Sequence, residues 1–154
     1  MIMKLKIDNI KVGGAIKILD KLPLKGLKSI HRTRLSEQLQ EHLKRIINEE
    51  DELRKEYCHL DDEGNPKVID GKLDLKDEEE FKDVIIEFYK EKVIIDSGDS
   101  QVMLKSVKQS MEETDVEFKG EEAYQFADLY ESIIGDNESQ INNEVEEVQY
   151  QEVE

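Results

Sequence analysis

The first residues to test for catalysis are the single cysteine and the three histidines. Cys58 and His59 are adjacent, and adjacent side chains on a helix or in a turn point in different directions. His42 lies sixteen residues before Cys58, so local geometry does not bring these two side chains together. The CxxC, HxxxH and HExxH spacings that hold zinc are absent from the sequence. These patterns predict neither an activated cysteine nor a metal centre.

Carboxylate pairs are too numerous in this chain to indicate acid–base catalysis. Such chemistry needs two carboxylates in unlike environments within one cleft, whereas 38 acidic residues produce adjacent pairs by chance. A glycine-rich phosphate cradle is also absent, since Gly13-Gly14 has no Lys-Ser/Thr after it and no GxGxxG occurs. We therefore expect a protein that is not an enzyme and that uses no cofactor.

A basic cluster near the start of the longest predicted helix is the most specific candidate for binding. Its members are Lys25, Lys28, His31, Arg32 and Arg34. Spacings of three and four residues place Lys28, His31 and Arg32 on one helix face. The cluster can bind an anionic partner, or it can pair with the chain's own acids, such as Glu37 and Glu41, or with those of the acidic C-terminal tail. Because the acids outnumber the bases and share their chain, we favour pairing within the molecule.

Two groups of glutamates are the candidates for an acidic binding surface. Glu78, Glu79 and Glu80 lie at the start of one predicted helix, and Glu121 and Glu122 lie at the start of another. Rows of carboxylates on helices can imitate the phosphates of a nucleic-acid duplex. The simpler interpretation is a solvated face that keeps a highly charged protein in solution.

Charge is distributed unevenly along the sequence. Residues 1–60 carry a net charge of +4 and residues 61–154 carry −20, which together give −16. We expect no direct nucleic-acid binding, because phosphate affinity depends on Lys and Arg. A single cysteine suits a reducing compartment, and neither a signal-peptide start nor a membrane-length apolar run is present. These features predict a protein of the cytoplasm without membrane contact.

Hydrophobic periodicity predicts an α+β fold with a long amphipathic helix, two to four shorter helices and a small sheet. Over residues 27–57 apolar residues recur at spacings of mostly three and four, giving a helix of about 45 Å. Part of this apolar stripe remains for a second helix or a second copy of the chain. Shorter helices are predicted after Asp8-Asn9, after Asp77, and over 101–111 and 121–134. The predicted sheet consists of residues 2–7, residues 93–95 and a small hairpin over residues 67–75, whose two strands, 67–70 and 72–75, flank Gly71.

The predicted domain covers residues 1–135, and residues 136–154 form an acidic tail. This tail has seven acidic residues and no Lys or Arg. Such a composition buries too little apolar surface to offset the entropy of ordering, so we expect the tail to be disordered when it is unbound.

Several stretches between residues 3 and 134 occur in an order that resembles one protein family. They are the strand–helix start, Ser29–Leu35, Glu56–Pro66, Asp74–Asp77, Val93–Ile95, Phe118–Tyr124 and Asp128–Tyr130. Together they resemble a small uncharacterised family of siphophages and prophages of low-GC Gram-positive bacteria. The family's function is unknown, so the resemblance carries over no catalytic residue. Its genes often lie near late genes, which implies a tail accessory or a factor that acts on the host.

The resemblance and the charge pattern together predict a non-catalytic, phage-encoded binding protein. It would act on a host or phage protein in the bacterial cytoplasm. One version inhibits a host-defence or nucleic-acid-handling enzyme through the acidic surface. The alternative is a tail-associated structural or assembly accessory protein of the virion.

Overall fold

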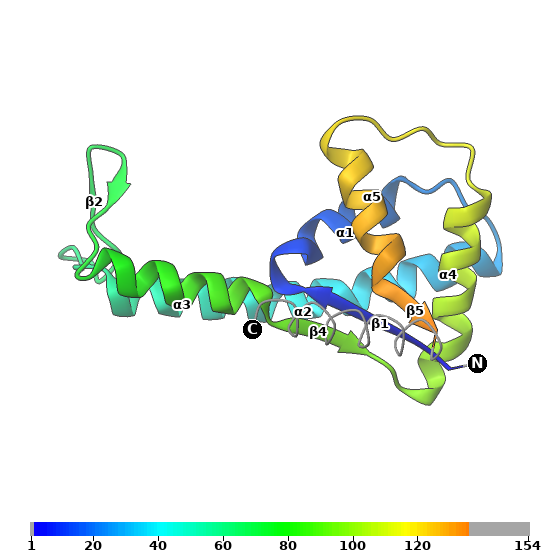
Figure 1. The fold of residues 1–154 in the computed structure, drawn as a ribbon, viewed down its shortest axis with the longest axis horizontal. Helices are drawn as coiled ribbons and strands as arrows, with labels where there is room; N and C mark the ends of the chain where they lie inside the picture. The colour runs from blue at the N-terminus through cyan, green and yellow to red at the C-terminus, as the bar shows by residue number, and fades with distance from the viewer. Residues whose placement is uncertain (1, 136–154) are drawn as a thin grey trace, which may run out of the picture.

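The computed structural model describes residues 2–135, which form an α+β fold. The predicted tail, residues 136–154, lies outside the described residues. A rounded head carries a long projecting arm (Figure 1). The elements in chain order are β1 (Met3–Asp8), a 3-10 turn (Asn9–Lys11), α1 (Val12–Lys21), α2 (Leu27–Tyr57), β2 (Val68–Ile69), β3 (Lys72–Leu73), α3 (Glu78–Lys90), β4 (Lys92–Ile95), a second 3-10 turn (Gly98–Ser100), α4 (Gln101–Glu113), α5 (Glu121–Ser132) and β5 (Ile133–Gly135).

The sheet of the head has β1 at its centre, with β4 and β5 on its two sides and both antiparallel to it. Leu5 of β1 lies opposite Ile95 of β4 and Ile133 of β5. All three side chains are buried. Since side chains alternate along a strand, this row defines the inner face of the sheet.

One strand of this sheet differs from the prediction. The hairpin predicted over residues 67–75 is confirmed as β2 and β3, but it does not join this sheet: it forms a separate two-stranded sheet at the far end of the arm. The third strand is β5, which the sequence analysis assigns to the end of a helix over 121–134. The helix ends at Ser132 because the next three residues pair with the free edge of β1, where β-branched Ile133 and Ile134 fit well.

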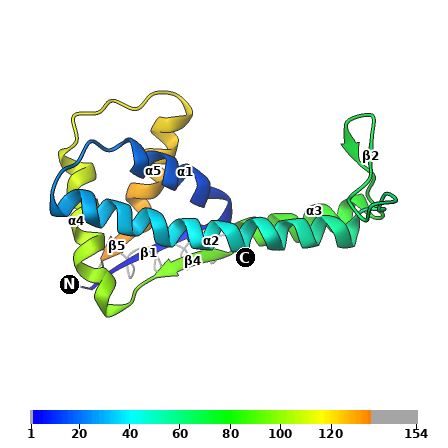
Figure 2. The ribbon, with the colours of Figure 1, turned by 180° about the vertical axis from the view of Figure 1, so that it is seen from behind.

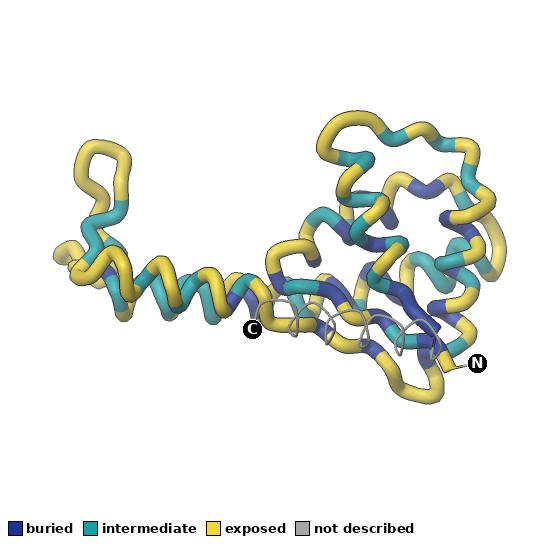
Figure 3. Tube along the Cα trace, viewed as in Figure 1, coloured by how far each residue is buried: buried dark blue, intermediate teal, exposed yellow. Residues whose placement is uncertain are grey.

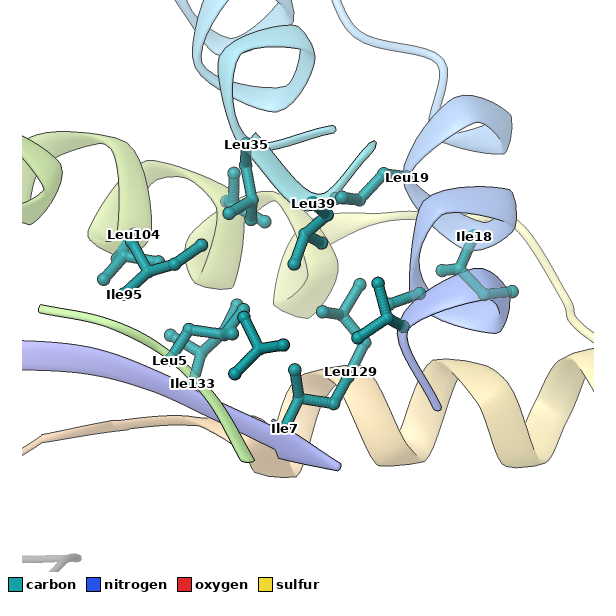
Figure 4. Packing of buried hydrophobic residues seen from close by; sticks show 14 of the residues in the cluster. Leu5, Ile7, Ile18, Leu19, Leu35, Leu39, Ile95, Leu104, Leu129 and Ile133 are labelled. Atoms are coloured by element: carbon teal, nitrogen blue, oxygen red, sulfur yellow. The ribbon is translucent and has the colours of Figure 1, made fainter. Parts of the chain in front are cut away.

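The hydrophobic core lies between the inner face of the sheet and the helices of the head (Figure 4). Each element contributes side chains that the periodicity of its sequence places on one face. The largest fully buried members are Leu5, Ile7, Ile18, Leu19, Leu22, Leu35, Leu39, Met103, Leu104, Leu129 and Ile133. The core therefore brings together residues from both ends of the described chain.

The long helix α2 has the bounds that the sequence predicts. Leu35 and Leu39 in its first half are buried in the head, and its second half extends outward. α3 runs back beside it in the opposite direction, as two opposite views show (Figures 1 and 2). The rings of Tyr57 and Phe81 lie 6.0 Å apart near the outer end of this pair. The outer apolar stripe of α2 is thus partly covered by α3 of the same chain.

We call residues 47–87 the arm and residues 58–77, at its outer end, the tip. Buried residues are concentrated in the head, whereas the arm and the tip consist mainly of exposed and half-buried residues (Figure 3). Such a projecting shape leaves most of the arm's surface available for contact with another molecule.

Candidate binding surfaces

Arg32, at the centre of the predicted basic cluster, binds backbone groups of its own chain. Its Nη1 donates to the carbonyl oxygens of Leu22 at 2.5 Å and of Leu19 at 3.3 Å, and its Nη2 donates to Ser29 Oγ at 3.1 Å. Carbonyls at the end of a helix have no partner within the helix. Arg32 therefore caps the carboxyl end of α1 and ties it to the start of α2.

Lys28 of the same cluster also has a partner within the molecule. Its Nζ lies 2.9 Å from Glu113 Oε2 at the end of α4. Glu37 and Glu41 are the partners predicted from the sequence, but Glu41 pairs with Lys44 at 3.6 Å. The hydrogen bond and charge of Lys28 hold the pKa of Glu113 below its ordinary value.

Two further ion pairs join the basic start of the chain to α5. Lys11 lies 3.4 Å from Asp128, and Lys21 lies 2.7 Å from Glu122. The hydrogen bond from Lys21 lowers the pKa of the Glu122 carboxyl. Folding thus brings these cations and anions together, although more than a hundred residues separate the partners along the chain.

The other members of the basic cluster do not form a joint anion site. Lys25 and Arg34 are exposed and make no ion pair with the described residues, and His31 is half-buried. Arg34 lines a shallow polar hollow on α2 together with Glu37 and Lys44. The cluster is therefore divided between structural contacts and separate exposed cations.

The predicted glutamates belong to two different parts of the molecule. Glu78, Glu79 and Glu80 form the first turn of α3 at the outer end of the arm, where the Asp77 carboxylate accepts from Glu80 N at 3.0 Å. Glu121 and Glu122 form the first turn of α5 in the head. The two groups therefore do not form one continuous row of carboxylates.

The cysteine and histidine of interest are held apart by α2. Cys58 follows the last residue of that helix and His42 lies within it, so about 24 Å of helix separates them. Burial raises the pKa of the Cys58 thiol, and the Asp74 carboxylate raises it further. Burial and the charge of Arg45 lower the pKa of His42. Within residues 2–135 no group of three His, Cys, Asp or Glu side chains is arranged to hold a metal ion.

The tip contains an apolar face that the sequence analysis did not identify. Backbone bridges pair Cys58 with Leu75 and Leu60 with Pro66, and the hairpin pairs Val68 with Leu73. Paired residues share a face, and so do residues two apart along a strand. All six side chains therefore lie on one face of the tip, which we call the tip face.

These side chains differ in their exposure. Cys58 is fully buried at the base, Leu73 and Leu75 are half-buried, and Val68 is 59% exposed. Ile69, which is 49% exposed, lies on the opposite side of the hairpin because it is the neighbour of Val68. The alternation Val68, Leu73, Leu75 around a turn was the sequence signal for this face.

Acidic residues predominate in the sequence around the tip face. Between residues 58 and 83 the sequence has ten acids and four lysines. Asp61 closes the exposed acidic turn, since its carboxylate accepts from Glu63 N at 2.9 Å and Asn65 N at 3.0 Å. The hairpin turn itself has Asp70 and Gly71 at φ of 52° and 79°, as a two-residue hairpin loop requires. The tip thus combines exposed apolar side chains with an excess of acidic residues.

No protein-family model, curated protein or solved structure matches this chain. None of the helices in the described part of the chain has the length and apolarity needed to cross a membrane. The candidate surfaces therefore have to be interpreted from their own chemistry.

Proposed function

We propose that this protein is a non-catalytic binding protein encoded by a phage, acting on a host or phage protein in the bacterial cytoplasm. It contacts that partner through the tip face. The observation that carries the proposal is the position of exposed aliphatic side chains at the end of a projecting arm. The resemblance given above supports the phage origin.

The chemistry of the tip favours one kind of partner. Leu60 and Val68 present apolar surface that water solvates poorly, which favours burial against a complementary apolar depression. The surrounding carboxylates attract Lys and Arg and speed the encounter with a basic surface. We therefore expect a protein whose binding site is an apolar depression bordered by basic side chains.

Two neighbouring residues provide a matched test of this proposal. Val68→Glu places a charge on the tip face, whereas Ile69→Glu places the same charge on the opposite side of the hairpin at similar exposure. The protein is tagged, exposed to a lysate of infected bacteria, and its bound proteins are identified by mass spectrometry. Loss of a central contact costs about 2 kcal/mol or more, so Val68→Glu should weaken binding of the partner roughly thirtyfold. Ile69→Glu should retain it.

Two results would count against the tip face. One is a partner that both variants retain equally, and the other is the recovery of no specific partner. Salt gives a second measurement, because screening beyond a distance of about 10 Å at 0.1 M weakens attraction to the acidic residues of the tip. A partner that binds the tip face should therefore associate more slowly as salt rises.

The alternative proposal is a tail-associated structural or assembly accessory protein of the virion. The observation that favours it is the same long arm, which can bridge two components of an assembly. Quantitative mass spectrometry of purified virions separates the two proposals. Stoichiometric presence in the virion supports the accessory role, and absence supports the cytoplasmic one.

A further inference from the structure

The sheet of the head has an outer face that differs in character from its inner face. Lys6 of β1 pairs with Ile94 of β4, and Lys4 pairs with Ile134 of β5. These four residues alternate with the buried row at Leu5, so they point away from the core. We call this set the outer face, and it combines two basic side chains with two β-branched apolar ones.

The apolar side chain that this face exposes is Ile94, which is 50% exposed in the middle of a strand. Another layer over it would be favourable, because apolar surface gains free energy when it is removed from water. Ile134, which lies opposite Lys4, is only 9% exposed and therefore adds little apolar surface for a further contact.

The segment after Gly135 has the composition that this face would bind. The tail, residues 136–154, carries seven acids and no Lys or Arg, opposite in sign to Lys4 and Lys6. It also contains apolar residues that could contact Ile94, namely Ile141, Val145, Val148, Tyr150 and Val153. Charge and hydrophobicity are thus both complementary to the outer face.

The tail also starts at the right place and is long enough. Gly135 pairs with Met3 of β1, so the tail leaves the described chain at the edge of the sheet. Its 19 residues can span roughly 60 Å when extended, at about 3.3 Å per residue. Three strands spaced about 4.8 Å apart form a sheet only about 10 Å wide. The tail can therefore cross the whole outer face.

We propose that residues 136–154 dock on the outer face of their own sheet. Their carboxylates pair with Lys4 and Lys6, and their apolar side chains cover Ile94. The tail is then a second layer of the head. This inference is independent of the tip face and of the partner proposed above.

Zero-length coupling by a carbodiimide tests the docking in the full chain, because it joins a lysine amine only to a carboxylate in contact with it. We expect Lys4 and Lys6 to couple to acids of the tail, whereas exposed Lys17 of α1 should not. Mixing unlabelled and ¹⁵N-labelled chains distinguishes coupling within one chain from coupling between two. Coupling only between chains, or no coupling from either lysine to the tail, would overturn the proposal.

A full-chain variant tests the apolar part of the contact. Replacing Ile141, Val145 and Val148 together by Ser leaves every carboxylate in place but removes apolar surface. We expect coupling to Lys4 and Lys6 to fall about tenfold or more, because apolar burial provides much of such a contact. Unchanged coupling in this variant would overturn the apolar part of the docking.

Discussion

Arg32→Ala is the substitution that best distinguishes a structural basic cluster from a binding one. Arg32 reaches the carbonyl oxygens of Leu19 and Leu22 and the hydroxyl of Ser29. Truncation to Ala leaves these acceptors without their charged donor. A structural role predicts a less stable protein, whereas a role only in partner binding predicts unchanged stability.

The size of the loss follows from the contacts. A hydrogen bond to a charged group contributes about 1.5–3 kcal/mol net, and Arg32 makes two such bonds to carbonyls at the end of α1. Arg32 is half-buried, so water can replace part of what is lost. We therefore expect the free energy of unfolding to fall by about 2 kcal/mol. For a chain of this size that lowers Tm by roughly 4–8 °C.

The assay is urea and thermal unfolding followed by far-UV circular dichroism. Arg34→Ala is the matched control, since Arg34 lies two residues further along α2, is exposed, and should change stability by less than about 0.5 kcal/mol. Arg32→Lys should recover only part of the loss, because an ammonium group cannot reproduce the forked geometry of the guanidinium. The reasoning is refuted if Arg32→Ala is as stable as the wild-type protein, or if Arg34→Ala is equally destabilised.

Three other predictions concern packing, thiol reactivity and pH. Gly14→Ala places a Cβ 2.9 Å from Gln125 Cγ, and this crowding should lower the free energy of unfolding by about 1 kcal/mol. Gly13→Ala meets open space and should raise the free energy of unfolding by roughly 0.5 kcal/mol, because Ala favours a helix more than Gly does. Urea titrations measure both changes. Burial and the raised pKa of Cys58 should make its labelling by a maleimide much slower in the folded protein than in urea; equal rates would contradict a closed tip. The pKa of the Glu122 carboxyl is lower in the folded protein than its ordinary value of 4.5, so its contact with Lys21 stabilises the fold at pH values above 4.5. This contribution disappears as the pH falls through the lowered pKa of the folded state. Glu122→Gln should therefore be less stable than wild type at pH 7 but not at pH 3, as unfolding at both pH values will show.

The amino-acid sequence by itself determined the long helix and the α+β class. α2 covers residues 27–57 because its apolar residues recur at helical spacing and it contains no internal Gly or Pro. Both signals involve residues that lie only a few positions apart. α3 likewise begins after Asp77, whose side chain caps the helix as the sequence indicates. These features depend on hydrogen bonds between residues close in sequence, so a local pattern is enough to predict them.

Only the tertiary structure decided the third strand and the position of the hairpin. Ile133–Gly135 is too short for its periodicity to distinguish a strand from a helix end, and the free edge of β1 makes it a strand. The hairpin pairs normally, but the length of α2 carries it away from the sheet. In both cases the deciding contact lies far away along the chain, where local propensity has no influence.

The tertiary structure also decided what the charged residues do. The sequence separates a basic start from an acidic remainder, yet Lys21 pairs with Glu122 and Lys28 pairs with Glu113. Arg32 became a helix cap because the fold places two carbonyls within its reach. The sign of a charge is written in the sequence, but its partner depends on which surfaces folding brings within a few ångströms, since ion pairs and hydrogen bonds act only at short range.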